Sequence, residues 1–168
     1  MAHSMILGMT ESGKTTLAKQ LATGYMAAGV VVLLLDPLND PEFPADYRTT
    51  DPTEFLDTFW ASRSCAVFID EAGDSVGKFD TLMQKTATRG RHWGHNVHYI
   101  TQRGTQLSKT VRDQCSNLFL FTTSLSDAKV HADEWNQQEI KAANSLKQGD
   151  YYHVTRFGQL VKRSAFDQ

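Results

Sequence analysis

The chain has 168 residues, of which 40% are hydrophobic, and its 17 Lys and Arg against 19 Asp and Glu give a formal charge of −2. These values predict one globular domain over residues 1–168, and any nucleic-acid contact must come from a local basic patch because the overall charge is not basic. The longest apolar stretch, 30–35, is too short to cross a bilayer, and we see no signal peptide. A soluble, cytoplasmic protein with reduced, structural Cys65 and Cys115 is expected, in which residues 1–4 are in part a cloning remnant.

The first apolar run, at residues 5–7, leads into the sequence GMTESGKT at residues 8–15. This sequence fits the phosphate-binding motif GxxxxGK[ST] at every fixed position, and an amphipathic stretch follows it, as the motif requires. Gly8 and Gly13 let backbone amides turn toward a β-phosphate, Lys14 would reach the β- and γ-phosphates, and Thr15 would bind Mg²⁺. The predicted nucleotide-binding residues are Gly8, Met9, Thr10, Glu11, Ser12, Gly13, Lys14, Thr15 and Thr16.

Along the rest of the chain, short apolar runs alternate with segments of helical periodicity, which is typical of a parallel sheet covered by helices. The expected strands are 5–7, 30–35, 65–69, 97–101 and 118–122. The sequence DPTE at 51–54 predicts an N-cap, a first-turn proline and a capping-box glutamate for a helix with Phe55, Leu56, Phe59 and Trp60 on one face. Further helices are expected at 75–88, with Val76, Phe79, Met83 and Ala87 inward, and at 108–115, 126–135 and 138–147.

Two segments near the C-terminus, 151–156 and 160–163, predict a closing β-hairpin. We therefore predict an α/β fold of the P-loop NTPase kind, in three layers. A mostly parallel central sheet would be flanked by helices and would end in the hairpin.

Two acidic residues, Asp70 and Glu71, directly follow the third apolar strand. Open α/β sheets bind their ligands at the carboxyl ends of strands, so both acids are expected near the phosphates. Asp70 is predicted to hold Mg²⁺ through water, and Glu71 to act as general base for the water that attacks the γ-phosphate. This pair favours a hydrolase over a small-molecule kinase, which would need an acceptor-binding lid. Phosphate transfer to an added acceptor would revive the kinase interpretation.

Gln102 ends the next strand, where its amide can orient the water or sense the γ-phosphate, or can simply cap the strand. Arg89 and Arg91 lie just before that strand in a loop punctuated by glycine. Arginine can stabilise the transition state of phosphoryl transfer, in its own subunit or in a neighbouring one. The alternative is a solvated loop with ordinary surface arginines.

These motifs, in this order, resemble the FtsK/HerA superfamily of ring-forming P-loop ATPases over residues 5–165. The sequence RHWGHNVHYITQ at 91–102 is similar to the family's arginine, glycine, apolar strand and final Thr-Gln, and Asp36-Pro37 is similar to a pair often found after the second strand. The resemblance implies that Gln102 is a sensor and that Arg91, with Arg89 in reserve, reaches the adjacent subunit's site. Glu11 stands where the family often has a small residue, so weaker nucleotide binding is expected.

The chain has no room for the attached domains of cellular members, so it looks like the compact genome-packaging ATPases of viruses. That resemblance implies an ATP- and Mg²⁺-dependent motor that forms a pentameric or hexameric ring and translocates double-stranded DNA into a capsid. A portal or capsid-vertex protein would be a further partner, in the host cytoplasm or at a virion vertex. The alternative is a nucleotide-gated assembly factor of the same superfamily that does not pump DNA.

Basic residues between the third and fifth strands are candidate DNA contacts, or equally a solvated face. They are Lys78, Lys85, Arg89, Arg91, Arg103, Lys109 and Arg112. Lys162 and Arg163 on the hairpin either meet DNA or a portal protein, or protect an edge strand from aggregation. His92, His95 and His98 straddle a loop and a strand, so a shared zinc site is not expected. Trp93 and Trp135 are expected to pack inside the protein or at a subunit interface, and the alternative is that they stack on the bases of a nucleic acid.

Overall fold

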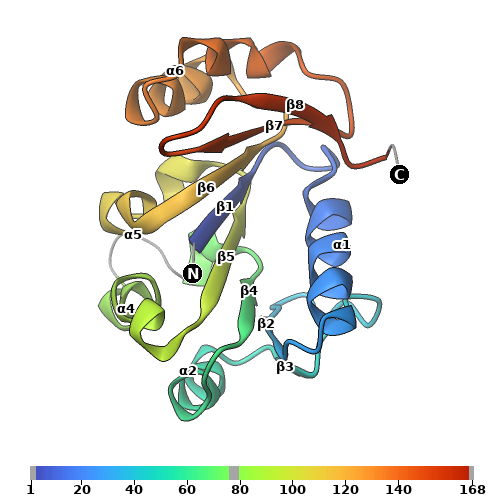
Figure 1. Cartoon of the computed structure of the whole chain (residues 1–168), viewed down its shortest axis with the longest axis vertical. Coiled ribbons are helices and arrows are strands. Elements are labelled where there is room, and N and C mark those ends of the chain that lie inside the picture. Colours follow the sequence, from blue (N-terminus) through green and yellow to red (C-terminus); the bar gives the residue numbers. More distant parts are fainter. Residues whose placement is uncertain (1–2, 76–79, 167–168) are drawn as a thin grey trace.

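The computed structural model describes residues 3–75 and 80–166, and its centre is an eight-stranded sheet in the order β3-β2-β4-β5-β1-β6-β7-β8. The strands are β1 (His3–Leu7), β2 (Val32–Leu35), β3 (Tyr47–Thr49), β4 (Ala66–Ile69), β5 (Asn96–Thr101), β6 (Cys115–Leu120), β7 (Asp150–Thr155) and β8 (Val161–Ser164). Across the sheet, every neighbouring pair from β3 at one edge to β6 is parallel. The hairpin of β7 and β8 is antiparallel, and β7 also pairs antiparallel with β6 (Figure 1). The predicted fold class is confirmed.

Helices cover the two faces of the sheet unequally, with α1 on one side and α2, α4 and α5 on the other (Figure 1). The helices are α1 (Lys14–Ala27), α2 (Pro52–Ala61), α3 (Ala72–Ser75), α4 (Thr81–Arg89), α5 (Lys109–Gln114) and α6 (Leu125–Glu134), with 3-10 helices η1 (Gly90–Trp93), η2 (Gly104–Gln106) and η3 (Gln138–Ser145). Alternate residues along each strand point to opposite faces, so two apolar clusters form. Leu17 of α1 packs in the cluster that contains Ile6, and Phe59 of α2 in the cluster that contains Tyr99.

Several boundaries differ from the sequence prediction. One helix was expected at 75–88, but Asp80 caps a separate helix, α4, by accepting a hydrogen bond from the Met83 amide at 3.0 Å. Met83 and Ala87 are buried as predicted, whereas Val76 and Phe79 lie outside the described residues. The 138–147 segment is 3-10 rather than α-helical. Further shifts of one to three residues include β1 starting at His3, β2 starting at Val32, α5 ending at Gln114 and β6 running from Cys115 to Leu120.

The start of α2 shows why one local prediction was only half right. Asp51 caps the helix by accepting a hydrogen bond from the Thr53 amide at 3.0 Å, as expected. The Glu54 carboxylate does not complete a capping box; it accepts hydrogen bonds from the Tyr47 hydroxyl at 3.0 Å and the Thr49 hydroxyl at 3.2 Å. Both hydroxyls belong to β3, a three-residue edge strand that the sequence pattern missed, and that strand competes for the carboxylate.

Cys65 and Cys115 are buried free thiols, and burial raises the pKa of Cys115 to about 12, so the reduced, structural interpretation is confirmed. Trp93 donates its indole N–H to the Trp60 carbonyl at 3.0 Å, and the Trp135 ring lies 3.7 Å from the Arg156 guanidinium carbon. Both tryptophans therefore pack within the protein. Within residues 3–75 and 80–166, no helix is long and apolar enough to span a membrane.

The predicted histidine series is separated in the structure. His92 is exposed, whereas His95 and His98 are buried. The His95 Nδ1 atom accepts a hydrogen bond from the Cys65 amide at 3.1 Å, and its Nε2 atom lies 2.9 Å from the Phe59 carbonyl oxygen. His98 instead stacks on Phe68, with ring centroids 4.6 Å apart. The three rings thus have different surroundings.

We expect buried His98 to make stability depend on pH. Burial, helped by the charge of the nearby His3, lowers the pKa of His98 to about 3. The unfolded chain takes up this proton near pH 6.5, so below that pH the unfolded state binds more protons and stability falls, by about 2 kcal/mol at pH 5. Urea unfolding from pH 7.5 to 5 would measure the loss.

His98→Phe should keep the stack on Phe68 and remove this part of the pH dependence. His92→Gln is the matched control, because its exposed ring should leave the dependence unchanged. An unfolding free energy of His98→Phe that falls with pH as steeply as that of the wild type would contradict the assignment.

Candidate functional site

The loop that joins β1 to α1 is fixed at the carboxyl edge of the sheet by backbone hydrogen bonds. The Gly8 amide donates to the Gln102 carbonyl at 3.2 Å, and the Met9 amide donates to the Thr122 carbonyl at 2.9 Å. Gly8 has φ +151°, and a Cβ atom there would lie 2.6 Å from the Phe121 Cβ. Only glycine allows this close approach, which brings the loop to the edge where open sheets bind ligands.

The N-terminal end of α1 offers positive charge to an anion. Gly13 is the N-cap residue and has φ +117°. Because glycine has no side chain to accept a hydrogen bond, the first amides of α1 are left uncapped and can bind an anion. The Lys14 ammonium donates to the carbonyls of Gly8 and Met9, and burial lowers its pKa while Glu71 and Asp70 oppose that shift. The half-buried ammonium of Lys14 and the uncapped amides of the helix start are donors that suit phosphate oxygens.

Asp70 and Glu71 end the neighbouring strand β4, which pairs with β5. The Asp70 Oδ1 atom accepts a hydrogen bond from the Glu71 amide at 2.9 Å. The pKa of Asp70 is raised to about 6, mainly by burial and also by the charges of Asp36 and Glu71, while the hydrogen bond from the Glu71 amide and the charge of Lys14 oppose the rise. The Asp70 carboxylate and the Thr15 hydroxyl supply oxygen ligands of the kind that Mg²⁺ prefers, and the surrounding negative charge favours a bound cation.

Glu71 has φ +52°, in the left-handed region that non-glycine residues rarely adopt. Strained backbone of this kind occurs at functional sites, where the surrounding structure maintains it. Here the Glu71 carbonyl accepts a hydrogen bond from the Asp74 amide at 2.9 Å as α3 begins.

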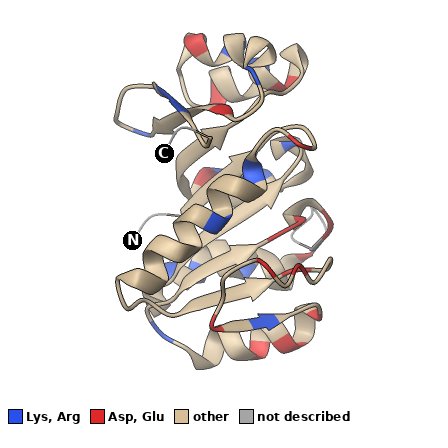
Figure 2. Cartoon of the chain, turned by 90° about the vertical axis from the view of Figure 1, so that its right-hand side faces the viewer, with Lys and Arg blue, Asp and Glu red and all other residues tan. Residues whose placement is uncertain are grey.

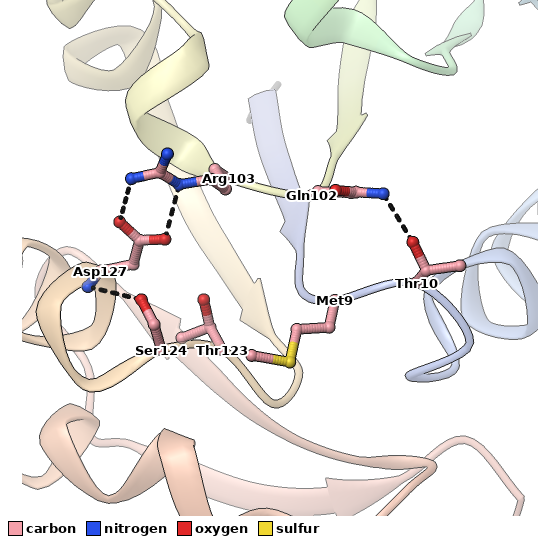
Figure 3. Close-up of a pocket in the computed structure, with 7 residues that line it drawn as sticks. All are labelled: Met9, Thr10, Gln102, Arg103, Thr123, Ser124 and Asp127. Carbon is pink, nitrogen blue, oxygen red and sulfur yellow. Dashed lines mark hydrogen bonds and ion pairs between the residues drawn. The ribbon is translucent and has the colours of Figure 1, made fainter.

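Gln102 contacts the phosphate-binding loop directly, because its Nε2 atom donates to the Thr10 hydroxyl at 2.6 Å (Figure 3). The next residue, Arg103, donates from Nε and Nη2 to the Asp127 carboxylate at 2.9 and 3.0 Å. Both pairs line a cavity of about 500 Å³. Its lining residues are Met9, Thr10, Gln102, Arg103, Thr123, Ser124 and Asp127.

Asp127 was not predicted to lie at the site. The Ser124 hydroxyl accepts a hydrogen bond from the Asp127 amide at 3.2 Å, so the spacing of the two residues signals only the start of α6. The nearly buried Asp127 holds the guanidinium of Arg103, the residue that follows Gln102, while the Gln102 side chain points the other way, toward Thr10 (Figure 3). The Arg103–Asp127 pair therefore links the segment that follows β5 to α6.

A second cavity, of about 230 Å³, lies along the other side of the loop. It is lined by Glu11, Gly13, Lys14, Thr15, Thr16, Gln148 and Phe166, of which the last two were missed by sequence reasoning. Glu11 is exposed, has φ +64° and accepts a hydrogen bond at its carbonyl from Gln148 Nε2 at 2.9 Å. Its left-handed backbone explains why a glycine is well suited to this position.

Arg89 and Arg91 are not brought to the site of their own chain. They precede β5, at the amino edge of the sheet, and this strand of six residues spans roughly 20 Å. Arg91 is exposed, lies 3.3 Å from the Gln114 Oε1 atom and helps lower the pKa of His3 at the start of β1. Any role in nucleotide hydrolysis must therefore concern another molecule.

Carboxylates neutralise much of the predicted basic cluster. The pairs are Arg103 with Asp127, Lys109 with Asp113 and Arg112 with Glu134, at 2.9 to 3.0 Å. On the hairpin, Lys162 lies 3.8 Å from Asp150 and Arg163 is exposed. Lys85 is half-buried, Arg89 and Arg91 are exposed, and Lys78 lies outside the described residues.

In Figure 2, acidic residues colour the loops on the right-hand side, beside the N-terminal end of α1.

Comparison with known proteins supports the fold resemblance. No family model and no curated protein match the chain. Among solved structures, it is similar to the genome packaging NTPase B204 from Sulfolobus turreted icosahedral virus 2 in complex with AMPPCP, with a TM-score of 0.83 and 18% identity over 97% of this chain and 96% of that chain. The chain has the fold of B204.

Two other solved structures share this fold. VirB4 of Thermoanaerobacter pseudethanolicus matches with a TM-score of 0.73 and 10% identity, over 96% of this chain and 88% of that one. The pCW3 conjugation coupling protein TcpA matches with a TM-score of 0.71 and 15% identity, over 97% of this chain and 59% of that one. The structural resemblance to FtsK/HerA-type ATPases, predicted from the sequence, is confirmed at the level of the fold.

Proposed function

We propose that this protein is an Mg²⁺-dependent ATPase that assembles into a ring and translocates double-stranded DNA, packaging a viral genome into a capsid. The observation that carries the proposal is the convergence of Lys14, Asp70 and Gln102 at one edge of a sheet with the B204 fold. B204 is a genome packaging NTPase, and a structure of it contains AMPPCP. The work would take place in the host cytoplasm, at a capsid vertex that supplies a portal or vertex protein as partner.

In this mechanism the loop amides and Lys14 hold the phosphates. To do so, the Lys14 ammonium exchanges its hydrogen bonds to the Gly8 and Met9 carbonyls for hydrogen bonds to phosphate oxygens. Thr15 and Asp70 would hold Mg²⁺, whose charge offsets that of the phosphates. Glu71 takes a proton from the attacking water. The Gln102 amide moves from Thr10 toward that water or the γ-phosphate, and thereby signals which nucleotide is present.

Coupling to DNA is proposed to pass from Gln102 through Arg103. These residues are adjacent, and the Arg103 fork on Asp127 joins the strand end to α6. A shift of Gln102 on hydrolysis would therefore move the Arg103–Asp127 pair. DNA contacts would come from the exposed arginines and from the assembled ring, because Lys109 and Arg112 are ion-paired.

We expect double-stranded DNA to raise the steady-state rate of ATP hydrolysis, and we expect the effect to weaken as salt rises, because phosphate contacts release counterions. Phosphate release would be measured with and without DNA over a salt series, at protein concentrations where light scattering shows a ring. A ring whose ATPase rate does not respond to DNA would contradict the motor. That result would favour the nucleotide-gated assembly factor, in which ATP binding switches partner affinity.

A further inference from the structure

The cavity beside the phosphate-binding loop contains one aromatic lining residue, Phe166, together with Gln148 and five residues from 11–16. We propose that this cavity binds the base of the nucleotide and that the Phe166 ring stacks on it. The inference rests on the proposed function, because it concerns the same nucleotide. It adds the class of base that the site accepts.

Backbone hydrogen bonds hold the segment that carries Phe166 against the loop. The Ala165 amide donates to the Gly149 carbonyl at 2.7 Å, and the Gly149 amide donates to the Ser12 carbonyl at 2.9 Å. From α1, the Gln20 side chain donates to the Ala165 carbonyl at 2.8 Å. Figure 1 shows the chain leaving β8 toward the start of α1. The position of Phe166 is thus tied to the phosphate-binding loop itself.

Two glycines make room for the ring. Gly149 has φ +89°, and a Cβ atom on it would lie 2.5 Å from the Phe166 Cδ2. A Cβ on Gly13, in the loop, would lie 3.2 Å from the Gly149 Cα. The aromatic ring therefore packs closely on Gly149, which in turn packs on the loop, and a side chain at either glycine would push these layers apart.

One side of Phe166 remains open to a ligand. Its side chain is 52% exposed, although the residue lines a cavity with Lys14 and Thr15. The other cavity, over Thr10, contains the Arg103–Asp127 ion pair, and the residues lining it include no aromatic ring. A base attached to phosphates at Lys14 would find its apolar stacking surface only on the Phe166 side, within the part of the chain that the structure describes.

Stacking on a ring depends on the area of the base more than on its hydrogen-bond pattern. The Gln148 side chain donates from Nε2 to the Glu11 carbonyl and so helps to hold the loop beside the ring. We therefore infer a site for purine nucleoside triphosphates that accepts adenine and guanine about equally and binds pyrimidines more weakly.

The test measures the binding of ATP, GTP, CTP and inorganic tripolyphosphate by calorimetry, with Mg²⁺ present. Phe166→Ala should weaken ATP and GTP binding about tenfold and leave tripolyphosphate binding unchanged. Phe166→Tyr should bind ATP as the wild type does. Phe157→Ala is the matched control, because Phe157 is fully exposed in the turn of the hairpin.

The outcomes separate the base site from the proposed function. If the wild type binds neither ATP nor tripolyphosphate, the nucleotide function itself is wrong. If the wild type binds both but Phe166→Ala binds ATP normally, only the base site is wrong. Equal loss of ATP and tripolyphosphate in Phe166→Ala would also overturn the base site, because the residue would then support the loop. Wild-type affinity for CTP equal to that for ATP would overturn the preference for purines.

Discussion

Glu71→Gln should abolish ATP hydrolysis and leave ATP binding intact. A glutamine cannot accept the proton of the attacking water, and the loss of a general base lowers the rate by about 10²- to 10⁴-fold. The substitution keeps the size of the side chain in a strained turn at φ +52°. Phosphate release would measure turnover, and calorimetry with a non-hydrolysable ATP analogue would measure binding.

The neighbouring acid explains why binding should survive. The Glu71 charge raises the pKa of Asp70, so its removal favours the ionised Asp70 that Mg²⁺ requires. Asp70→Asn should behave differently and weaken Mg²⁺-dependent nucleotide binding itself. Glu139→Gln is the control for removal of an exposed carboxylate, and its turnover should equal that of the wild type. Normal turnover in Glu71→Gln would assign the general base to another residue.

The sequence predicted the parts of the site that local pattern determines. The phosphate-binding motif, the acids after β4 and the amide after β5 each stand directly at a strand end, and parallel pairing of β4, β5 and β1 brings those ends to one edge. Asp127 and Phe166 had no such signal, because their partners Arg103 and Gly149 lie far along the chain or across a turn. Those contacts depend on how α6 and the hairpin pack.

The fold was predictable to a similar extent. The buried apolar strands between helices were predicted correctly, whereas β3 was missed because three half-buried residues at a sheet edge give no periodicity. The start of β6 was assigned to a helix because polar Ser116 and Asn117 interrupt its apolar pattern. Burial at these places depends on neighbouring elements, which local sequence does not encode.

Arg91→Ala should lose ATP hydrolysis on the proposal that this arginine, as the family resemblance implies, completes the site of an adjacent subunit. Arg91 is exposed at the amino edge of the sheet, away from its own phosphate-binding loop, so a head-to-tail ring is needed to deliver it. An arginine that stabilises the transition state in trans contributes about 10³- to 10⁵-fold in kcat. Steady-state phosphate release at ring-forming concentrations would measure the loss, and Arg89→Ala in parallel would decide between the two arginines.

Mixing two inactive variants distinguishes this role from a structural one. In a mixed ring, an Arg91→Ala subunit keeps Glu71, and a Glu71→Gln neighbour supplies the missing arginine, so roughly a quarter of the interfaces regain activity at equal mixing. Arg63→Ala, which removes another exposed arginine, is the control and should keep its turnover. If Arg91→Ala hydrolyses ATP normally, or if the mixture recovers nothing while both variants still form rings, the arginine does not act across the subunit boundary.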